Sequence, residues 1–362
     1  MLPYVIVYLT LLITFILGRK VSIKDQKILS YALIIIFTLL RGLRWKTGTD
    51  WDYYEDIFTN VDQYIKYDLN QVEIGFLYFN KLIKVLYDNY TFYLIVSNLL
   101  FLISYYKFCY YFFKSYPLEA FSICLICLDL FPVRQTFAVA IIIWVVPLML
   151  QKKYIQSVFV ILMAYFVHRT SLIMLLFLPP VIHNIKLSYL TRVISYICIF
   201  ILSAKWGLEQ LINSYVLPLL PSDGGAAYRA LLYMNPNKND HEIGITSIII
   251  TCIILFAVKI LLKKNNSTLL LVSLNAYYLH QTIFVLFQDG VVAEFSRFAS
   301  YFSWGYFILI IFIYKGINNR KIALTFICIL FLYKFNSLFN SYNELLIPYY
   351  SIFDNYIPNR TF

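Results

Sequence analysis

Long apolar segments separated by short polar breaks recur along the whole chain of 362 residues. Most are close to the length of roughly 20 residues that a helix needs to cross a bilayer. The pattern predicts an all-α, polytopic transmembrane helix bundle that forms one integral membrane domain over residues 1–362. We expect about twelve spans, near residues 3–18, 28–43, 89–107, 118–132, 134–150, 154–167, 170–183, 193–211, 245–262, 269–288, 297–314 and 322–339.

Short basic loops orient these spans. They comprise residues 19–27, 151–153, 263–268 and 315–321. Short loops rich in Lys and Arg stay in the cytoplasm, so twelve crossings place both termini on the extracytoplasmic side. The first apolar run has no basic residue before it and no small-residue cleavage site, so we expect a retained span rather than a signal peptide. Residues 74–87 carry two lysines and are expected to form an interfacial or partly re-entrant helix rather than a full span.

Two extracytoplasmic loops, residues 44–73 and 212–244, are long enough to contribute to a site. In the first, apolar residues recur at helical spacing: Trp51, Tyr54, Phe58, Val61 and Ile65. Polar residues occupy the opposite side: Asp52, Glu55, Asp56 and Asn60. This pattern predicts an amphipathic helix on the outer leaflet, with Thr49 as its N-cap and Asp52 completing a capping box.

Composition excludes several classes of protein. Apolar residues make up 61% of the chain and charged residues 14%, whereas soluble domains carry about 25% charged residues. The net charge of +11 has no basic soluble domain to carry it, so we expect no nucleic-acid partner. Cys124 and Cys127 form a C-x-x-C pair inside an apolar run without polar neighbours, which favours packing over a redox or zinc site.

Arginines gather at the outer ends of the predicted spans. They lie in the stretch from Arg41 to Arg44 and in three short hairpin segments, Pro132–Gln135, Val167–Ser171 and Glu294–Phe298. Arginine suits bidentate binding of phosphate. A bundle could bring these groups together at one depth, which predicts a site for an anionic lipid. The alternative is that each arginine only anchors its span at the interface.

Several short blocks resemble the EpsG-like O-antigen and exopolysaccharide polymerases (Wzy-type). The most distinctive runs from Arg44 to Tyr54 around Gly48-Thr-Asp50. The other blocks are Glu73-Ile-Gly-Phe76 with Asn80-Lys-Leu-Ile83, Arg134-Gln135, His168 with Ser171, Arg297 with Tyr301-Phe302, and Pro348-Tyr-Tyr-Ser351. Within the first block, Trp45-Lys46 departs from the more apolar pair expected of the family.

The resemblance implies polymerisation of undecaprenyl-diphosphate-linked oligosaccharide units on the outer face of the bacterial inner membrane. Donor and acceptor are both lipid-linked; whether a chain-length regulator also binds stays open. The expected contacts to diphosphate and sugar are Arg41, Arg44, Arg134, Gln135, Arg297, Trp51, Tyr54, Glu73 and Glu294. Arginines can stabilise the departing diphosphate without a metal or cofactor.

The acceptor hydroxyl needs a general base, for which His168 and Asp50 are the candidates. His168 could equally be a packing histidine. Asp50 and Asp52 are two positions apart, so they do not share a helix face, and this disfavours a metal pair. A glycan ligase would use the same groups as a polymerase, and only the resemblance separates the two. A flippase should place charges at mid-membrane rather than at one face.

Overall fold

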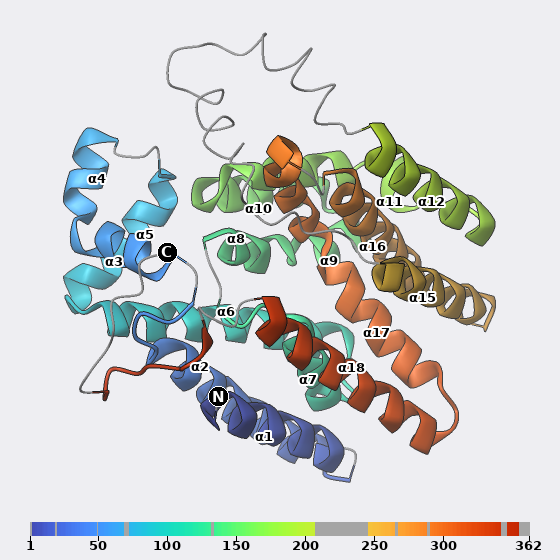
Figure 1. Ribbon diagram of the computed structural model, residues 1–362, viewed down its shortest axis with the longest axis horizontal. Helices are drawn as coiled ribbons and strands as arrows, with labels where there is room; N and C mark the ends of the chain where they lie inside the picture. Colours follow the sequence, from blue (N-terminus) through green and yellow to red (C-terminus); the bar gives the residue numbers. More distant parts are fainter. Residues whose placement is uncertain are drawn as a thin grey trace. The chain divides into compact units, whose positions relative to one another are not determined.

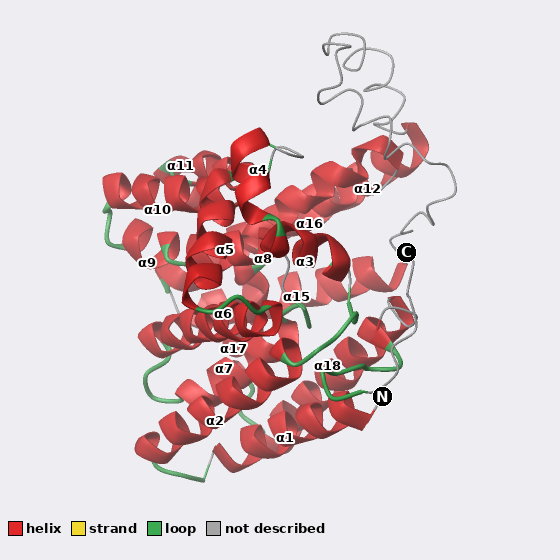
Figure 2. Cartoon of the chain, turned by 90° about the vertical axis from the view of Figure 1, so that its left-hand side faces the viewer, coloured by secondary structure: helices red, strands yellow, loops and turns green. Residues whose placement is uncertain are grey.

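The computed structural model describes residues 2–18, 20–48, 50–68, 72–131, 134–206, 245–264, 267–287, 290–341 and 346–354. Within these ranges the chain is helical, with no strand beyond one isolated bridge between Arg44 and Ser351 (Figure 2). The predicted all-α class is therefore confirmed for this part of the chain.

The chain divides into two compact units, and residues 1–172 and 317–362 form the first. Its helices are α1 (Leu2–Gly18), α2 (Ile23–Gly42), α3 (Trp51–Thr59), α4 (Val61–Tyr67), α5 (Ile74–Leu86), α6 (Tyr90–Phe112), α7 (Pro117–Cys127), α8 (Arg134–Ile142), α9 (Val145–Leu150), α10 (Tyr154–Val167) and α18 (Arg320–Ser341). Helix α2 packs along α6, α1 packs against α2 and α7, and α18 packs against α7 (Figure 1).

Residues 173–316 form the second unit. A 3₁₀ segment, η2 (Arg169–Phe177), leads into it. Its other elements are α11 (Pro180–His183), α12 (Tyr189–Trp206), α15 (Ile245–Lys264), α16 (Thr268–Leu286), the 3₁₀ segment η5 (Gly290–Phe302) and α17 (Trp304–Gly316). Helix α16 is central to this unit, since it contacts α11, α12, α15, α17 and η5 (Figure 1).

Two described helices are long and apolar enough to cross a membrane, α6 and α16. Residues 296–316 add a third if η5 and α17, bent by 45° at their junction, count as one span. The other predicted spans also contain helix, but no helix in them meets this criterion by itself among the described residues. Twelve spans with both termini outside therefore stay a prediction.

Three predicted spans are interrupted. Residues 134–150 form α8 and α9 rather than one helix, because the ring of Pro147 clashes with the carbonyl four residues earlier, at Ile143. Residues 170–183 form η2 and α11, with the break at Pro179, and a proline disfavours α-helix at the residue before it. The span predicted at 297–314 begins as 3₁₀ helix and becomes α-helical only at Trp304.

The predicted amphipathic helix is in fact two helices, α3 and α4, which meet at Asn60. Asn60 ends α3, where its backbone N–H donates to the carbonyl oxygen of Asp56 at 2.9 Å, and the same residue is the N-cap of α4. Asp50 precedes α3 as the capping residue and makes no side-chain cap; the predicted cap, Thr49, lies outside the described residues. The apolar face packs against α5 and α6 rather than lying free for the lipid.

Candidate functional site

The turn after α2 folds back on the guanidinium of Arg44. Arg44 Nη1 donates to the carbonyl oxygen of Thr47 at 3.0 Å, and the guanidinium lies 4.4 Å from the centre of the Phe131 ring. Gly48 has φ of +97°, and a Cβ there would lie 2.5 Å from Arg44 Nη1. Only glycine combines that backbone conformation with so close an approach. The Gly48 position of the sequence block therefore shapes the turn around Arg44.

The C-terminal segment, residues 346–354, pairs with this turn. The backbone N–H of Trp45 donates to the carbonyl oxygen of Tyr350 at 2.9 Å, and that of Ile352 donates to Leu43 at 3.0 Å. The Tyr349 hydroxyl donates to the carbonyl oxygen of Leu40, at the end of α2, at 2.8 Å. Two sequence blocks about 300 positions apart thus form one small backbone assembly that fixes where Arg44 lies.

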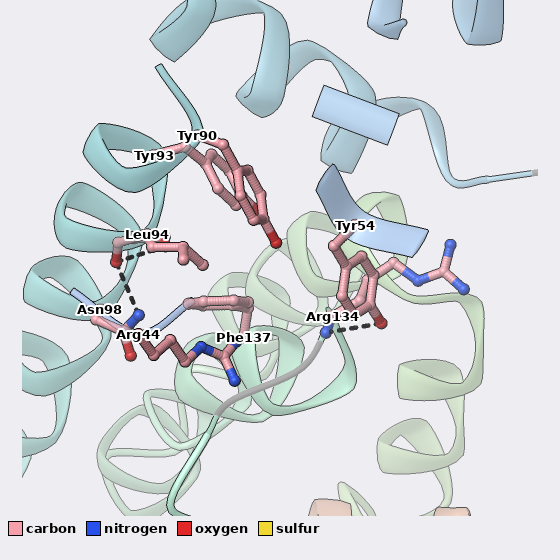
Figure 3. Close-up of a pocket in the computed structure, with 9 residues that line it drawn as sticks. Arg44, Tyr54, Tyr90, Tyr93, Leu94, Asn98, Arg134 and Phe137 are labelled. Carbon is pink, nitrogen blue, oxygen red and sulfur yellow. Dashed lines mark hydrogen bonds between the residues drawn. The ribbon is translucent and has the colours of Figure 1, made fainter. Parts of the chain in front are cut away.

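A narrow recess opens beside Arg44 in the first unit (Figure 3). It is lined by Arg44, Tyr54, Tyr90, Tyr93, Leu94, Ser97, Asn98, Arg134 and Phe137. Its open volume is about 10 Å³, close to what one water molecule requires. The rings of Tyr90 and Tyr93 stack with their centres 5.6 Å apart and point toward the space between Arg44 and Tyr54 (Figure 3). A larger ligand would need these side chains to move.

The recess concentrates polar atoms that lack partners. Arg44 is 3% exposed and, among the described residues, makes no ion pair with a carboxylate. Burial lowers the pKa of Arg44, an effect that neighbouring tyrosines oppose. Buried atoms without a hydrogen-bond partner are Arg44 Nε, Tyr90 Oη, Asn98 Oδ1 and Arg134 Nε. Since buried polar groups are nearly always paired in a finished core, a water molecule or a polar or anionic group of a ligand would complete these bonds.

Tyr54 presents a hydroxyl at the edge of this recess. The backbone N–H of Arg134 donates to the Tyr54 hydroxyl at 3.4 Å (Figure 3). Burial raises the pKa of Tyr54 to about 12, although the nearby charge of Arg134 opposes the shift. The hydroxyl therefore stays protonated near neutral pH and can donate a hydrogen bond to a ligand.

An ion pair between Glu73 and Arg134 organises the other side of the site. Arg134 Nη1 lies 2.8 Å from Glu73 Oε2, and the backbone N–H of Arg169 donates to Glu73 Oε1 at 3.0 Å. The guanidinium also lies 5.9 Å from the centre of the Phe76 ring. One carboxylate thus joins the start of α8 to the start of η2. In Figure 3 the guanidinium groups of Arg44 and Arg134 lie on opposite sides of the Tyr54 ring.

Gly75 makes this junction possible. A Cβ on Gly75 would lie 2.6 Å from the backbone oxygen of Phe166, in the last turn of α10. Helix α5 can therefore approach α10 closely enough for Glu73 to reach Arg169 only because position 75 has no side chain. This gives a physical reason for the Glu73-Ile-Gly-Phe76 block.

His168 lies next to the Glu73–Arg134 pair but does not line the recess. It ends α10, is half-buried, and places Nδ1 2.7 Å from the Thr170 hydroxyl. Its neighbour in the sequence, Arg169, is the residue that Glu73 binds through the backbone. Asp50, the other candidate base, is exposed at the start of α3 in a left-handed conformation, with φ of 56°.

Other predicted contacts lie outside the recess. Arg41 is buried in the core, where its guanidinium lies between the rings of Phe37 and Phe101 and donates to the carbonyl oxygen of Asp129 at 2.8 Å. Trp51 is 2% exposed, and its ring packs against Trp45 and Tyr90. Both side chains support the fold around the site and have no open face for a sugar.

The remaining predicted contacts divide between the two units. Gln135 is half-buried and follows Arg134 on α8. Arg297 is exposed on η5 and belongs to the second unit, as does Glu294, whose side chain lies outside the described part of the chain. In the described residues there is no group of three or more His, Cys, Asp or Glu side chains arranged to hold a metal.

Sequence reasoning missed the wall that α6 contributes. Tyr90, Tyr93, Ser97 and Asn98 all line the recess. Tyr90, Tyr93 and Ser97, which are three and four positions apart, share one face of α6, and Asn98 lies at its edge. Polar groups sharing a face of a membrane helix are a signal for function. The wall could therefore have been identified from that periodicity in the sequence.

Comparison with known proteins agrees with the predicted resemblance. No curated protein and no solved structure matches the chain. The family model described as EpsG family matches residues 27–351, which include every predicted site residue and all the residues of the recess. This match confirms the resemblance, and the chain belongs to the EpsG family.

Proposed function

We propose that this protein is a polysaccharide polymerase, a glycosyltransferase that joins undecaprenyl-diphosphate-linked oligosaccharide units into an O-antigen or exopolysaccharide. Membership of the EpsG family supports a polysaccharide polymerase-like membrane protein. The observation that carries the proposal is the recess of Arg44, in which a buried cation without a carboxylate partner among the described residues faces other unpaired polar atoms. We place the reaction at the outer face of the bacterial inner membrane.

The chemistry is a displacement at the anomeric carbon of the donor. The bond from that carbon to the diphosphate oxygen breaks, and the diphosphate leaves with the electron pair. The acceptor hydroxyl oxygen forms the new glycosidic bond and gives its proton to a base. Charge develops on the diphosphate as it leaves, so cations and hydrogen-bond donors that contact it once the recess has opened lower the barrier. Arg44 and the Tyr54 hydroxyl supply these groups, with Arg134 held beside them by Glu73.

We assign the general base to His168. Its Nδ1 is engaged by the Thr170 hydroxyl, which orients the ring. Imidazole also titrates near neutral pH, which suits proton removal from a hydroxyl. Asp50 remains the competing base because it immediately precedes the α3 turn that carries Tyr54. Gln135, Arg297 and Glu294 stay predicted contacts with diphosphate or sugar.

The direct test is polymerisation by purified protein in lipid nanodiscs. The substrate is a single undecaprenyl-diphosphate-linked repeat unit, and the product is read as a ladder of glycan lengths. We expect a ladder with the unmodified protein, with or without a chelator. Failure to form glycosidic bonds would contradict the proposal, and transfer of glycan only to a non-identical lipid acceptor would indicate a ligase instead.

The same assay decides the base. We expect His168→Ala to abolish elongation while Asp50→Asn leaves it measurable, provided that both variants insert and purify like the parent. The reverse result would move the role to Asp50. Normal elongation by both variants would show that neither residue removes the proton.

A further inference from the structure

A second cavity lies beside the recess in the first unit, and its character is different. Its volume is about 210 Å³. It is formed between α5, α6, α8 and the end of α10, and it is lined mainly by Phe76, Phe79, Leu100, Phe101, Phe137 and Ile141. Aromatic and aliphatic side chains thus surround a space large enough for part of an apolar ligand.

The few hydroxyl groups in this cavity are already satisfied. Ser104 Oγ donates to the carbonyl oxygen of Ala140 at 2.8 Å and accepts from the indole of Trp144 at 2.9 Å. Ser97 Oγ donates to the carbonyl oxygen of Leu94 at 3.2 Å. Neither hydroxyl therefore needs a water molecule as a hydrogen-bond acceptor. An apolar cavity without free polar groups stays dry and takes apolar ligands.

The cavity and the recess share walls. Ser97 and Phe137 line both. Phe76 lines the cavity on one side and lies under the Arg134 guanidinium, 5.9 Å from its ring centre. The cationic recess therefore adjoins the apolar cavity, just as the charged diphosphate of a lipid diphosphate adjoins its hydrocarbon chain.

We propose that this cavity binds the head-proximal part of the polyprenyl chain of the lipid-linked substrate. The inference rests on the proposed function for the identity of the head group, and on the geometry for the place of the chain. Binding the chain here would hold the diphosphate next to Arg44 and Tyr54. The cavity is too small for a whole polyprenyl chain, so the rest must leave it.

The rest of the polyprenyl chain can leave the cavity beside Leu100. Leu100 lines the cavity and is 52% exposed, on the long apolar helix α6. A chain that passes Leu100 would continue along the outer surface of a helix that is suited to contact lipid. The remainder of the polyprenyl chain can then stay in the bilayer, and no deep channel is needed.

An unfilled apolar cavity is unfavourable, because the side chains around it lose packing contacts. The cavity lies at the junction of four helices beside the site, where a bound chain would restore the missing packing contacts. A bilayer acyl chain could also enter from Leu100, but it would have no reason to prefer the end that adjoins the recess. The shared walls favour the substrate chain.

A photo-crosslinking experiment tests the place of the chain without requiring turnover. The probe is an undecaprenyl diphosphate with a diazirine in the isoprene units next to the head, applied to the full-length protein in nanodiscs. We expect labelled peptides from residues 97–104 and 137–141, and competition by unlabelled polyprenyl diphosphate. Labelling elsewhere, or equal labelling by a diazirine phosphatidylglycerol, would overturn the proposal.

A cavity-filling variant tests its consequence. Ala140 lines the cavity and is buried, so Ala140→Phe places a ring inside it. Met163→Phe, on an exposed side of α10, is the matched control. With the undecaprenyl donor we expect Ala140→Phe to lower kcat/KM about tenfold relative to Met163→Phe, whereas a donor whose diphosphate carries a methyl group in place of the prenyl chain is used equally by the two variants.

The outcomes separate the two proposals. If Ala140→Phe is as active as the control with both donors, the place assigned to the chain is wrong while the polymerase remains. If the unmodified protein makes no ladder but the probe labels the cavity, the lipid site stands and the polymerase does not. The cross-linking result remains decisive even if Ala140→Phe fails to fold.

Discussion

Two turns of this chain are each built around a buried arginine, and they differ in what surrounds the guanidinium. Arg44 is 3% exposed in the first unit, and Arg192 is 2% exposed in the second. Both leave some guanidinium nitrogens without partners. Arg192 donates to Asn275 Oδ1 at 2.6 Å and lies 5.3 Å from the centre of the Tyr278 ring. Arg44 instead faces a recess that holds other unpaired polar atoms.

The comparison shows that burial of a cation does not by itself mark a site. Arg192 also donates to the carbonyl oxygen of Ile185, and the amide of Asn275 donates to the carbonyl oxygen of His183 at 2.7 Å. These bonds attach the turn before α12 to α16, so Arg192 has a structural task. Arg44 combines burial with open space and with neighbours that can contact the same ligand.

The difference between Arg44 and Arg192 is tested by replacing each arginine with alanine. We expect Arg44→Ala to lower polymerisation by about a hundredfold or more, the loss typical of one preorganised donor at a site of developing charge. We expect Arg192→Ala to keep activity per folded molecule but to lose about 1.5–3 kcal/mol of stability for each charged hydrogen bond. Ladder formation and thermal unfolding in the same nanodiscs measure both effects.

Each variant serves as the control for the other. A stable Arg192→Ala protein that makes no glycan would place Arg192 in the reaction and contradict its structural role. Full activity in Arg44→Ala would remove the recess from the mechanism. Because Arg44 also binds the Thr47 carbonyl, unfolding of each purified variant must be measured before its activity is compared.

The next largest effect is expected from Glu73→Gln. The amide oxygen of glutamine can still accept from the backbone N–H of Arg169, but the charge facing Arg134 is lost. Removing one partner of a largely buried ion pair typically costs about 2–5 kcal/mol. We therefore expect a lower melting temperature and, because Arg134 is no longer held beside the recess, an activity loss of about tenfold, the effect of 1.4 kcal/mol on the reaction barrier.

The exposed pair of Lys81 and Asp62, 2.8 Å apart on α5 and α4, provides the control. Asp62→Asn removes an equally short ion pair at the surface, where such pairs contribute about 0–1 kcal/mol. Glycan ladders should be unchanged in that variant. Equal losses in Asp62→Asn and Glu73→Gln would mean that the Glu73–Arg134 pair has no special role at the site.

Much of the fold was predictable because apolar run length and helix position follow the same physical requirement. Every predicted apolar segment contains described helix, and α1 and α10 match their predicted limits within a residue. The 3₁₀ segments η2 and η5 were not predicted, because hydropathy does not report which backbone carbonyl each N–H will reach. The pairing of Trp45 with Tyr350 was also beyond the sequence pattern, since no local signal links positions so distant.

Charged residues in the sequence indicated part of the candidate site. The direction in which each side chain packs could not be predicted. Arg44 and Arg134 are charged residues at predicted span ends and both line the recess, while Glu73, at the end of a predicted loop, forms an ion pair with Arg134. Arg41 has the same charge and lies only three positions from Arg44, yet its side chain enters the core between two phenylalanines. The direction of a side chain depends on the tertiary neighbours, which one sequence does not specify.

A smaller and more selective effect is expected from Gly75→Ala. The added Cβ would meet the Phe166 backbone at 2.6 Å, so α5 must shift away from α10. Overpacking of this kind typically costs about 1–3 kcal/mol, and it also moves Glu73 away from Arg169. We expect a lower melting temperature and an activity loss of about tenfold or less. Val85→Ala, at an exposed position of α5, should show neither change.

The smallest effect is expected from Tyr349→Phe, which tests how the C-terminal segment fixes the recess. The change removes the hydrogen bond to the Leu40 carbonyl but keeps the ring that packs 5.4 Å from Tyr4. One neutral hydrogen bond contributes about 0.5–1.5 kcal/mol, and the backbone bonds of Trp45 and Ile352 remain. We expect a small loss of stability and activity within about threefold of the parent. A loss as large as that of Arg44→Ala would instead assign Tyr349 itself to the reaction, because a positioning bond with two backbone bonds beside it cannot produce so large an effect.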